Sequence, residues 1–198
     1  MANCTLAWVN HVDTATLTAS SEAAGLPVVN LANPIIGRRW RSLVTTGYGQ
    51  ADFGANVTTE MVALVFPRDT VLPTASETIR HRFDADGGTP GTGAVHDSGA
   101  IASGVRAGYG YHLYVPPAPV SARYWRFTFD CPSLSYIDVG RAWAGPKFQP
   151  SGNFSFEWQD VWDDLSRVVA AVRSGAEYVD PRARQRRIGF ALEWMPAA

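Results

Sequence analysis

The stretch NLANPIIGRRWRSLVTTGYGQADFG, residues 30–54, decides the fold of this chain. An irregular loop leads into Trp40–Ser42, and a glycine-rich turn separates this tripeptide from Gln50–Phe53 and Gly54. The apolar run Met61–Phe66 follows. Glycine and proline interrupt regular structure, and a short apolar run between such breaks favours a buried strand. We therefore predict strands at Gln50–Phe53 and at Met61–Phe66, the second lying centrally between two packed layers.

Other short segments alternate between apolar and polar residues, which is typical of a strand with one buried face. The two clearest are Glu77–Phe83 and Tyr124–Phe129. Their apolar faces carry Ile79, His81 and Phe83 in the first and Trp125, Phe127 and Phe129 in the second. Further strands are expected at Thr14–Ser20, Tyr109–Val115 and Tyr136–Trp143. About eight strands with no alternating helices predict an all-β sandwich.

Composition and charge describe an ordinary folded protein. The chain has 198 residues, of which 46% are hydrophobic and 18% charged, and its formal net charge is −1. This balance gives no global attraction to nucleic acid or to an anionic membrane. No apolar run approaches the ~20 residues of a membrane span. The first residues lack the basic-then-apolar pattern of a secretory signal, so synthesis in a cytoplasm is expected.

The two cysteines, Cys4 and Cys131, are too few for a disulfide framework and have no metal-ligand spacing. Two buried reduced thiols are the simplest interpretation. A bridge would require the first strand to pair beside the strand that contains Cys131. The sequence leaves this pairing open.

The motifs of enzymes and metal sites are missing from the sequence. There is no Gly-x-Ser-x-Gly elbow, no His-Glu-x-x-His helix and no phosphate-binding Gly-Lys-Ser/Thr loop. Asp84-Ala-Asp-Gly-Gly88 has the spacing that opens many calcium loops, but no Glu follows at the position that completes one. A glycine-rich turn explains this segment better. We therefore expect neither catalysis nor a metal or other cofactor.

Aromatic residues are candidates for two different roles. Tyr48, Tyr109 and Tyr111 lie near glycine-rich segments and could stack on a sugar ring, although some are expected to be core residues. Trp40 and Trp125 are expected in the core, together with Asp52, Phe53 and Gly54, whose turn should end a strand. For Trp40 the alternative is a platform for a ligand.

The character of the sequence changes near residue 148, which predicts a domain at 1–148 and a β-rich arm at 149–198. The arm contains a tryptophan-rich segment, an arginine run and a final expected strand at Ile188–Trp194. Its candidate interface residues are Trp158, Trp162, Arg182, Arg184, Arg186 and Arg187. Alternating arginines on one strand face suit the carboxylates of a protein partner. A solvated strand face is the plain alternative, and nucleic acid is disfavoured because no aromatic residue is interleaved for base stacking.

Two resemblances extend this interpretation. From about residue 10 to residue 145, the order of NLANP, WRS, QADFG, RYWRF and YIDVGRAWAG resembles the galactose-binding-like (discoidin-type) jelly-roll β-sandwich. The C-terminal segment from Glu157-Trp158 to Phe190-Ala-Leu-Glu-Trp194 resembles the closing segment of tail-tip and baseplate proteins of long-tailed bacteriophages and prophages.

The second resemblance implies a structural adaptor of a phage tail, located in the virion. Its partners would be other tail proteins, and it would form a homo-oligomer around or attached to the tail axis. Nucleic acid and membrane insertion are not expected. The alternative is a carbohydrate-binding module that contacts host-surface glycans through aromatic, Arg or Asp side chains at one loop end of the sandwich.

Overall fold

The computed structural model describes residues 5–85, 94–105, 110–150, 159–163, 167–170, 177–180 and 185–189. The chain divides into two compact units, Ala7–Lys147 and a smaller one that comprises Met1–Leu6 and Phe148–Ala198. The boundary expected after residue 148 lies one residue beyond Lys147. The smaller unit also includes residues 1–6, which the sequence places with the sandwich.

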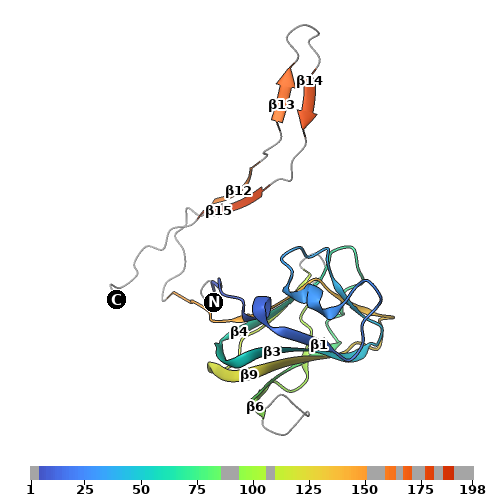
Figure 1. The fold of residues 1–198 in the computed structure, drawn as a ribbon, viewed down its shortest axis with the longest axis vertical. Coiled ribbons are helices and arrows are strands. Elements are labelled where there is room, and N and C mark those ends of the chain that lie inside the picture. Colours follow the sequence, from blue (N-terminus) through green and yellow to red (C-terminus); the bar gives the residue numbers. More distant parts are fainter. Residues whose placement is uncertain are drawn as a thin grey trace. The chain divides into compact units, whose positions relative to one another are not determined.

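The larger unit is built from antiparallel strands (Figure 1). Its elements are η1 (His11–Thr14), β1 (Thr16–Ala19), η2 (Val28–Ala32), β2 (Trp40–Ser42), β3 (Thr46–Thr59), β4 (Met61–Val65), β5 (Thr78–Asp84), β6 (Ala94–Asp97), β7 (Ile101–Ala102), β8 (Tyr111–Tyr114), β9 (Val120–Asp130), β10 (Ile137–Val139) and β11 (Arg141–Gly145). One sheet has the order β1-β3-β9-β5-β6, with β7 also paired to β5. A second has the order β11-β4-β8, and β10 pairs with β2.

The two sheets face each other across one hydrophobic core. Phe127 and Phe129 of β9 and Leu64 of β4 are buried in it, with Phe66 just beyond β4 packed edge-on against Phe129 at 6.4 Å between ring centroids. The expected all-β sandwich is therefore confirmed. Neither described helix is long and apolar enough to cross a lipid bilayer.

The predicted strand faces are confirmed in the two clearest segments. In β5 and β9 the residues that the alternation assigns to the apolar face are all buried: Ile79, His81, Phe83, Trp125, Phe127 and Phe129. Met61–Phe66 also behaves as expected, because β4 is the central strand of its sheet and has buried residues on consecutive positions. Burial on both faces of this strand explains why its sequence is continuously apolar.

Both tryptophans expected in the core are fully buried, with 0% exposure for Trp40 and for Trp125. The Trp40 ring packs against Phe127 at 6.1 Å between centroids, and its Nε1–H donates to the Ser21 carbonyl at 3.0 Å. A buried indole N–H needs such a partner. Trp40 therefore occupies the core rather than forming a platform for a ligand.

The structure differs from the sequence expectation at Asp52, Phe53 and Gly54. The first two are half-buried and Gly54 is exposed, and β3 continues to Thr59 instead of ending here. The register with β9 shifts between Asp52 and Val57, which marks a bulge. Asp52 Oδ1 accepts the Gly54 N–H at 2.8 Å, and Gly54 adopts a φ of +78°, a conformation that favours glycine. The motif therefore bends a long strand.

Arg123 of β9 lies opposite this bulge and holds it. Its Nε and Nη2 donate to the two carboxylate oxygens of Asp52 at 2.7 and 2.8 Å. The hydrogen bond from Arg123 lowers the pKa of Asp52, because it stabilises the charged form. Asp52 therefore forms an ion pair at a bulge inside β3, a position that the sequence does not distinguish from the end of a strand.

One expected strand is divided in two. The sequence predicts a single strand over Tyr136–Trp143, but Gly140 separates β10 from β11. A Cβ at Gly140 would lie 2.7 Å from the Ile36 carbonyl oxygen, so the loop between β1 and β2 crosses close to this backbone. The close approach requires glycine and shifts the chain from one sheet to the other.

The smaller unit contains two antiparallel ladders among its described residues. They are β12 (Gln159–Asp163) paired with β15 (Gln185–Gly189), and β13 (Arg167–Ala170) paired with β14 (Glu177–Asp180). The strand expected at Ile188–Trp194 overlaps β15 only at its start, and residues 190–194 lie outside the described residues.

Cys131 is a buried free thiol at the end of β9. Burial raises the pKa of this thiol to about 12, which keeps it protonated and unreactive near neutral pH. Cys4 lies outside the described residues.

We predict that Gly49→Ala destabilises the larger unit. Gly49 faces Phe127 across the β3–β9 ladder, and a Cβ there would overlap the Phe127 ring. Over-packing of this kind costs about 1–3 kcal/mol of unfolding free energy, which chemical denaturation can measure. Gly37→Ala is the matched control, because nothing lies within 4 Å of the position that its Cβ would take. Equal stability of the two variants would contradict this account of the core.

Candidate functional site

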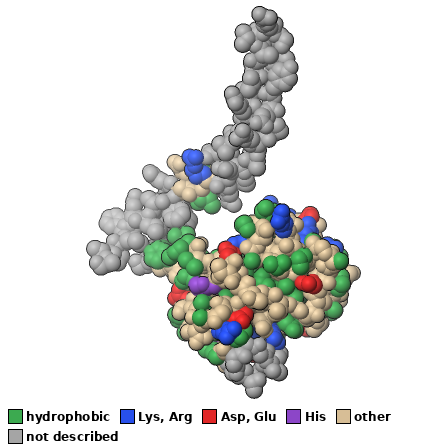
Figure 2. Space-filling view, viewed as in Figure 1, with side chains coloured by type: hydrophobic (Ala, Val, Ile, Leu, Met, Phe, Trp, Pro, Cys, Tyr) green, Lys and Arg blue, Asp and Glu red, His purple; other side chains and the backbone are tan. Residues whose placement is uncertain are grey.

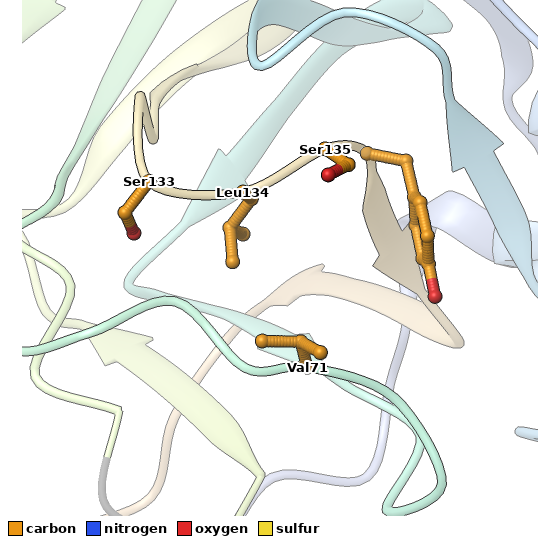
Figure 3. A pocket seen from close by; sticks show the side chains of 5 residues that line it. Val71, Ser133, Leu134 and Ser135 are labelled. Atoms are coloured by element: carbon orange, nitrogen blue, oxygen red, sulfur yellow. The ribbon is translucent and has the colours of Figure 1, made fainter.

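A pocket of about 110 Å³ lies at the end of the sandwich where β4 and β9 finish. It is lined by Val71 from the loop between β4 and β5 and by the loop between β9 and β10, which contributes Ser133, Leu134, Ser135 and Tyr136. In Figure 3 Val71 lies across the hollow from Leu134, with Ser133 and Ser135 on either side of Leu134. Apolar and hydroxyl groups therefore alternate around its wall.

The Tyr136 ring is held from one side by Arg41 of β2. The guanidinium carbon of Arg41 lies 4.0 Å from the ring centroid, which is the geometry of a cation–π contact. Arg41 reaches this position because the strand alternates, with Trp40 and Ser42 buried and Arg41 between them half-exposed. The contact fixes an aromatic side chain at the rim of the pocket.

Arg41 is in turn fixed by Asp138 of β10, which lies directly opposite it in the β2–β10 ladder. Arg41 Nε and Nη2 donate to the two carboxylate oxygens at 2.7 and 2.8 Å. Arg39 Nη1 and Thr70 Oγ1 each donate to Asp138 Oδ2 at 3.1 Å. Thr70 precedes Val71, so one buried carboxylate joins three segments around the pocket.

The charge of Asp138 is maintained by these donors. Burial alone would raise the pKa of this fully buried carboxyl, but the hydrogen bonds from Arg41 and Arg39 outweigh burial, and the pKa lies below its ordinary value. Arg39 also pairs at 2.6 Å with Asp69, whose side chain is 69% exposed. Asp138 is therefore ionised and fully paired at neutral pH, so its role is to hold the surrounding side chains in place.

Glu77 supports the opposite wall of the pocket. This residue, only 5% exposed, accepts the Thr74 N–H on Oε2 at 2.6 Å. Its Oε1 accepts both the backbone N–H of Ser133, at 3.2 Å, and the Ser133 hydroxyl. Glu77 therefore ties the loop between β4 and β5 to the loop between β9 and β10.

Two of the tyrosines expected to contact a glycan, Tyr48 and Tyr111, do not line this pocket. Tyr48 is half-buried on β3, with the Arg126 guanidinium carbon 4.2 Å from its ring centroid. Tyr111 is 47% exposed on β8, in the other sheet. The structure does not bring these two together, and Tyr109 lies outside the described residues.

Of the residues expected at an interface, only part falls within the described arm. The ladder places Trp162 opposite Arg186 and Val161 opposite Arg187, which is exposed. Trp158, Arg182 and Arg184 lie outside the described residues. The expected alternation over 182, 184 and 186 can therefore be followed only at its last member.

The charged side chains form local pairs rather than a field of one sign. Figure 2 shows basic and acidic side chains near one another on the visible face of the sandwich. Arg123–Asp52 at 2.7 Å and Arg141–Asp13 at 2.8 Å are two such pairs. In the part of the chain that the structure describes, no group of three or more His, Cys, Asp or Glu side chains could hold a metal ion.

Sequence reasoning missed the residues that build the pocket, above all Arg41, Tyr136 and Glu77. One signal could have found Arg41: in Trp-Arg-Ser, a strand that buries the tryptophan must turn the arginine the other way. A second signal is Asp138, a carboxylate inside the apolar run Tyr136-Ile-Asp-Val, which needs a cationic partner if buried. Glu77 and Ser133 lie in segments 56 residues apart, and no local pattern relates them.

Comparison with known proteins by sequence finds no match: neither a protein-family model nor a curated protein corresponds to this chain. Comparison of structures does find proteins with a similar fold. Chitosan-binding module 1 of a chitosanase/glucanase from Paenibacillus sp. IK-5 matches with a TM-score of 0.55 at 19% identity, covering 70% of this chain and 100% of the module.

Two other solved structures match as well. The family 32 carbohydrate-binding module of C. perfringens NanJ, in complex with galactose, has a TM-score of 0.54 at 12% identity and covers 70% of this chain and 98% of that one. The lectin domain of lectinolysin, complexed with Lewis B antigen, has a TM-score of 0.55 at 12% identity, covering 72% and 98%. At these identities the likeness establishes the fold, and the fold is the galactose-binding-like β-sandwich.

We predict that Asp138→Asn loosens the pocket and destabilises the sandwich. The neutral amide leaves the guanidinium groups of Arg39 and Arg41 without their shared buried counter-charge, a loss of about 3 kcal/mol for a broken buried pair. Thermal and chemical unfolding would measure this loss. Asp69→Asn also removes a partner of Arg39, but at an exposed site, so we expect little change. Equal effects of the two substitutions would show that burial of Asp138 is irrelevant.

Proposed function

We propose that the larger unit is a carbohydrate-binding module that takes a sugar residue in the pocket between Val71 and the Ser133–Tyr136 loop. The observation that carries the proposal is the Tyr136 ring, fixed by Arg41 next to the exposed residues Ser133 and Ser135. A sugar ring has apolar C–H faces, which pack on an aromatic ring, and hydroxyl groups, which hydrogen-bond to polar side chains. The wall of this pocket offers both.

The size of the pocket limits what it holds. Its volume of about 110 Å³ is below the roughly 300–1,000 Å³ of sites that enclose a drug-sized ligand. It fits the edge of a single sugar residue, with the rest of a glycan remaining in solvent. So small a contact favours an affinity of about 1 mM, because few ligand atoms are desolvated.

The hydrogen bonds that hold the pocket residues in place favour binding, although the pocket is small. Tyr136 and Val71 are held through Asp138 and its three donors, and Ser133 is held by Glu77. A ligand that meets side chains already fixed loses less conformational entropy on binding. The solved structures with the same fold also support the proposal, since their names include chitosan, galactose and Lewis B antigen.

We predict that Tyr136→Ala abolishes saccharide binding. Loss of the ring removes the packing surface for the sugar, and truncation of an aromatic anchor typically costs about 2 kcal/mol, which is roughly thirtyfold in affinity. A glycan array would select the ligand, and calorimetry at millimolar concentration would compare the variants. Thermal unfolding checks that the variant is folded.

Tyr48→Ala is the matched control, because Tyr48 is also a partly buried tyrosine under a guanidinium group. It should bind like the parent chain. Binding that persists in Tyr136→Ala but disappears in Tyr48→Ala would move the site to the sheet face. The absence of binding to every saccharide would reject the proposal itself.

The smaller unit supports a second proposed function, attachment of the sandwich to a neighbouring subunit, as in the phage tail tip that the C-terminal segment resembles. Among the described residues each of its ladders has two strands. A two-stranded ladder is only marginally stable in water without further packing. Val161 and Ile188 are 44% and 52% exposed on this arm, and a partner that buries them would stabilise it.

We predict that removing residues 151–198 prevents self-association and leaves the sandwich folded. The truncation begins beyond Lys147, the last residue of the larger unit, and it also keeps the bridge between Leu6 and Phe148. Sedimentation would show an oligomer for the full chain and a monomer for the truncated one, with the same unfolding midpoint for the sandwich. A full chain that stays monomeric at every concentration would argue against a docking arm between copies.

A further inference from the structure

A pair of buried histidines joins the two sheets of the sandwich. His81 of β5 is 0% exposed and His112 of β8 is 3% exposed, and their Nε2 atoms lie 2.8 Å apart. Trp125 Nε1 is 3.3 Å from His81 Nδ1. His112 Nδ1 forms a hydrogen bond with the Ser103 carbonyl oxygen.

These partners fix the proton on each ring. An indole N–H can only donate, so His81 Nδ1 accepts and the proton of a neutral His81 lies on Nε2. His81 Nε2–H then donates to His112 Nε2, which leaves the proton of His112 on Nδ1, where it donates to the Ser103 carbonyl. With both rings neutral, every ring nitrogen has a partner. One additional proton would place two N–H groups against each other, either between the histidines or against Trp125.

The hydrogen bonds continue from Ser103 to the pocket. Ser103, itself 0% exposed, donates its hydroxyl to the Thr74 carbonyl at 2.7 Å and its N–H to the Glu77 carbonyl at 2.7 Å. The Glu77 carboxylate accepts the Thr74 N–H and holds Ser133 at the pocket wall. A continuous series of hydrogen bonds, buried at the histidines and partly buried nearer the pocket, thus connects the histidine pair with Ser133.

Other titratable groups border this series. His96 lies near His81 and its Nε2 is 2.7 Å from the Tyr114 hydroxyl, while the Tyr114 ring stacks on His81 at 5.1 Å. Burial raises the pKa of Tyr114, and the nearby negative charge of Asp97 raises it further. Asp97 is itself paired with Arg80 and Arg82. The Cys131 thiol lies near the carboxylates of Glu77 and Asp130, and these two charges add to the effect of burial in raising its pKa. None of the carboxylates named above contacts either histidine of the pair.

Burial lowers the pKa of both histidines, that of His81 well below its ordinary value, and the charges that His112 and His96 would carry lower it further. The unfolded chain therefore takes up protons first as the pH falls below about 6.5. The fold therefore loses stability as the pH falls below about 6.5, whereas in the folded protein the pair stays neutral until the pH reaches the lowered pKa values of the two rings.

We propose that the neutral His81–His112 pair positions Ser133 at the pocket, so that proton uptake by the pair weakens saccharide binding there. This inference rests on the proposed carbohydrate-binding function. The pair and Glu77 are positioning residues, since Ser133 alone among these side chains lines the pocket. A purely structural pair would lower stability in acid without moving Ser133 in the folded protein.

The first test needs no ligand. Ring ¹⁵N signals of His81 and His112 and the amide signal of Ser133 are followed by NMR on the full chain from pH 7.5 to pH 4.5. At pH 7.5 we expect His81 protonated on Nε2 and His112 on Nδ1. We expect the Ser133 amide to shift with the same midpoint as the rings, below 6.5. Titration of the rings without movement of Ser133 would overturn the proposal.

The second test measures affinity for the best saccharide of the array over the same pH range. We expect about a tenfold loss as the histidines titrate, comparable to the loss of one good hydrogen bond. In His112→Asn, whose amide can still donate to the Ser103 carbonyl, this pH dependence should disappear. His11→Asn, outside the series, should retain it. An unchanged affinity across the titration of the rings in the parent chain would contradict the coupling.

Glu77→Gln tests the connection between the histidine pair and Ser133 without a change of pH. The amide cannot accept from both Thr74 and Ser133, so affinity at pH 7.5 should fall about tenfold. Glu60→Gln, which also loses a carboxylate that accepts a backbone N–H, should leave affinity unchanged. If the parent chain binds no saccharide, the proposed function fails, whereas the NMR titration still decides whether the histidines position Ser133.

Discussion

The burial of Trp40 is the constraint on which the loop end of the sandwich depends. Its ring fills the space between the sheets against Phe127 and Phe129, at 6.1 and 6.3 Å between centroids. Because side chains alternate along a strand, the register that buries Trp40 also turns Arg41 away from the core. The β2–β10 ladder then places Asp138 opposite Arg41, and the same guanidinium supports Tyr136. One packing requirement thus determines both the core and the rim of the pocket.

The buried carboxylates of Asp138 and Glu77 have hydrogen-bond donors on both oxygens, and they connect segments that are distant in the sequence. Asp138 accepts from Arg39, Arg41 and Thr70, and Glu77 accepts from Thr74 and Ser133. Buried carboxylates rarely add net stability compared with apolar residues, but removing their donors is costly. Their consequence here is geometric, because irregular loops are held in one arrangement where strand pairing ends. A pocket built on such loops keeps its shape without a ligand.

Period-2 alternation was sufficient to predict the sandwich and much of its core, since it reflects a rule that acts on each strand separately. It identified the buried faces of β5 and β9, including His81, without any tertiary information. The sequence did not predict the bulge at Asp52–Gly54, because a polar turn inside a strand and one at its end have the same sequence pattern. The pocket and the histidine pair could not be predicted from the sequence for a different reason. Their members meet only after two sheets have stacked and two loops have closed, and contacts at such separations leave no local pattern.

The two units have properties that complement each other. A pocket of about 110 Å³ can bind one sugar residue only weakly, and a weak site serves adhesion poorly when it acts alone. Linking several copies raises the effective concentration of each site near the others, so that avidity exceeds single-site affinity by about 10²–10⁴-fold. An arm of two-stranded ladders that requires a partner would provide such linkage. The two proposed functions, carbohydrate binding and subunit docking, are therefore compatible, because docking of several copies would compensate for weak binding at each site.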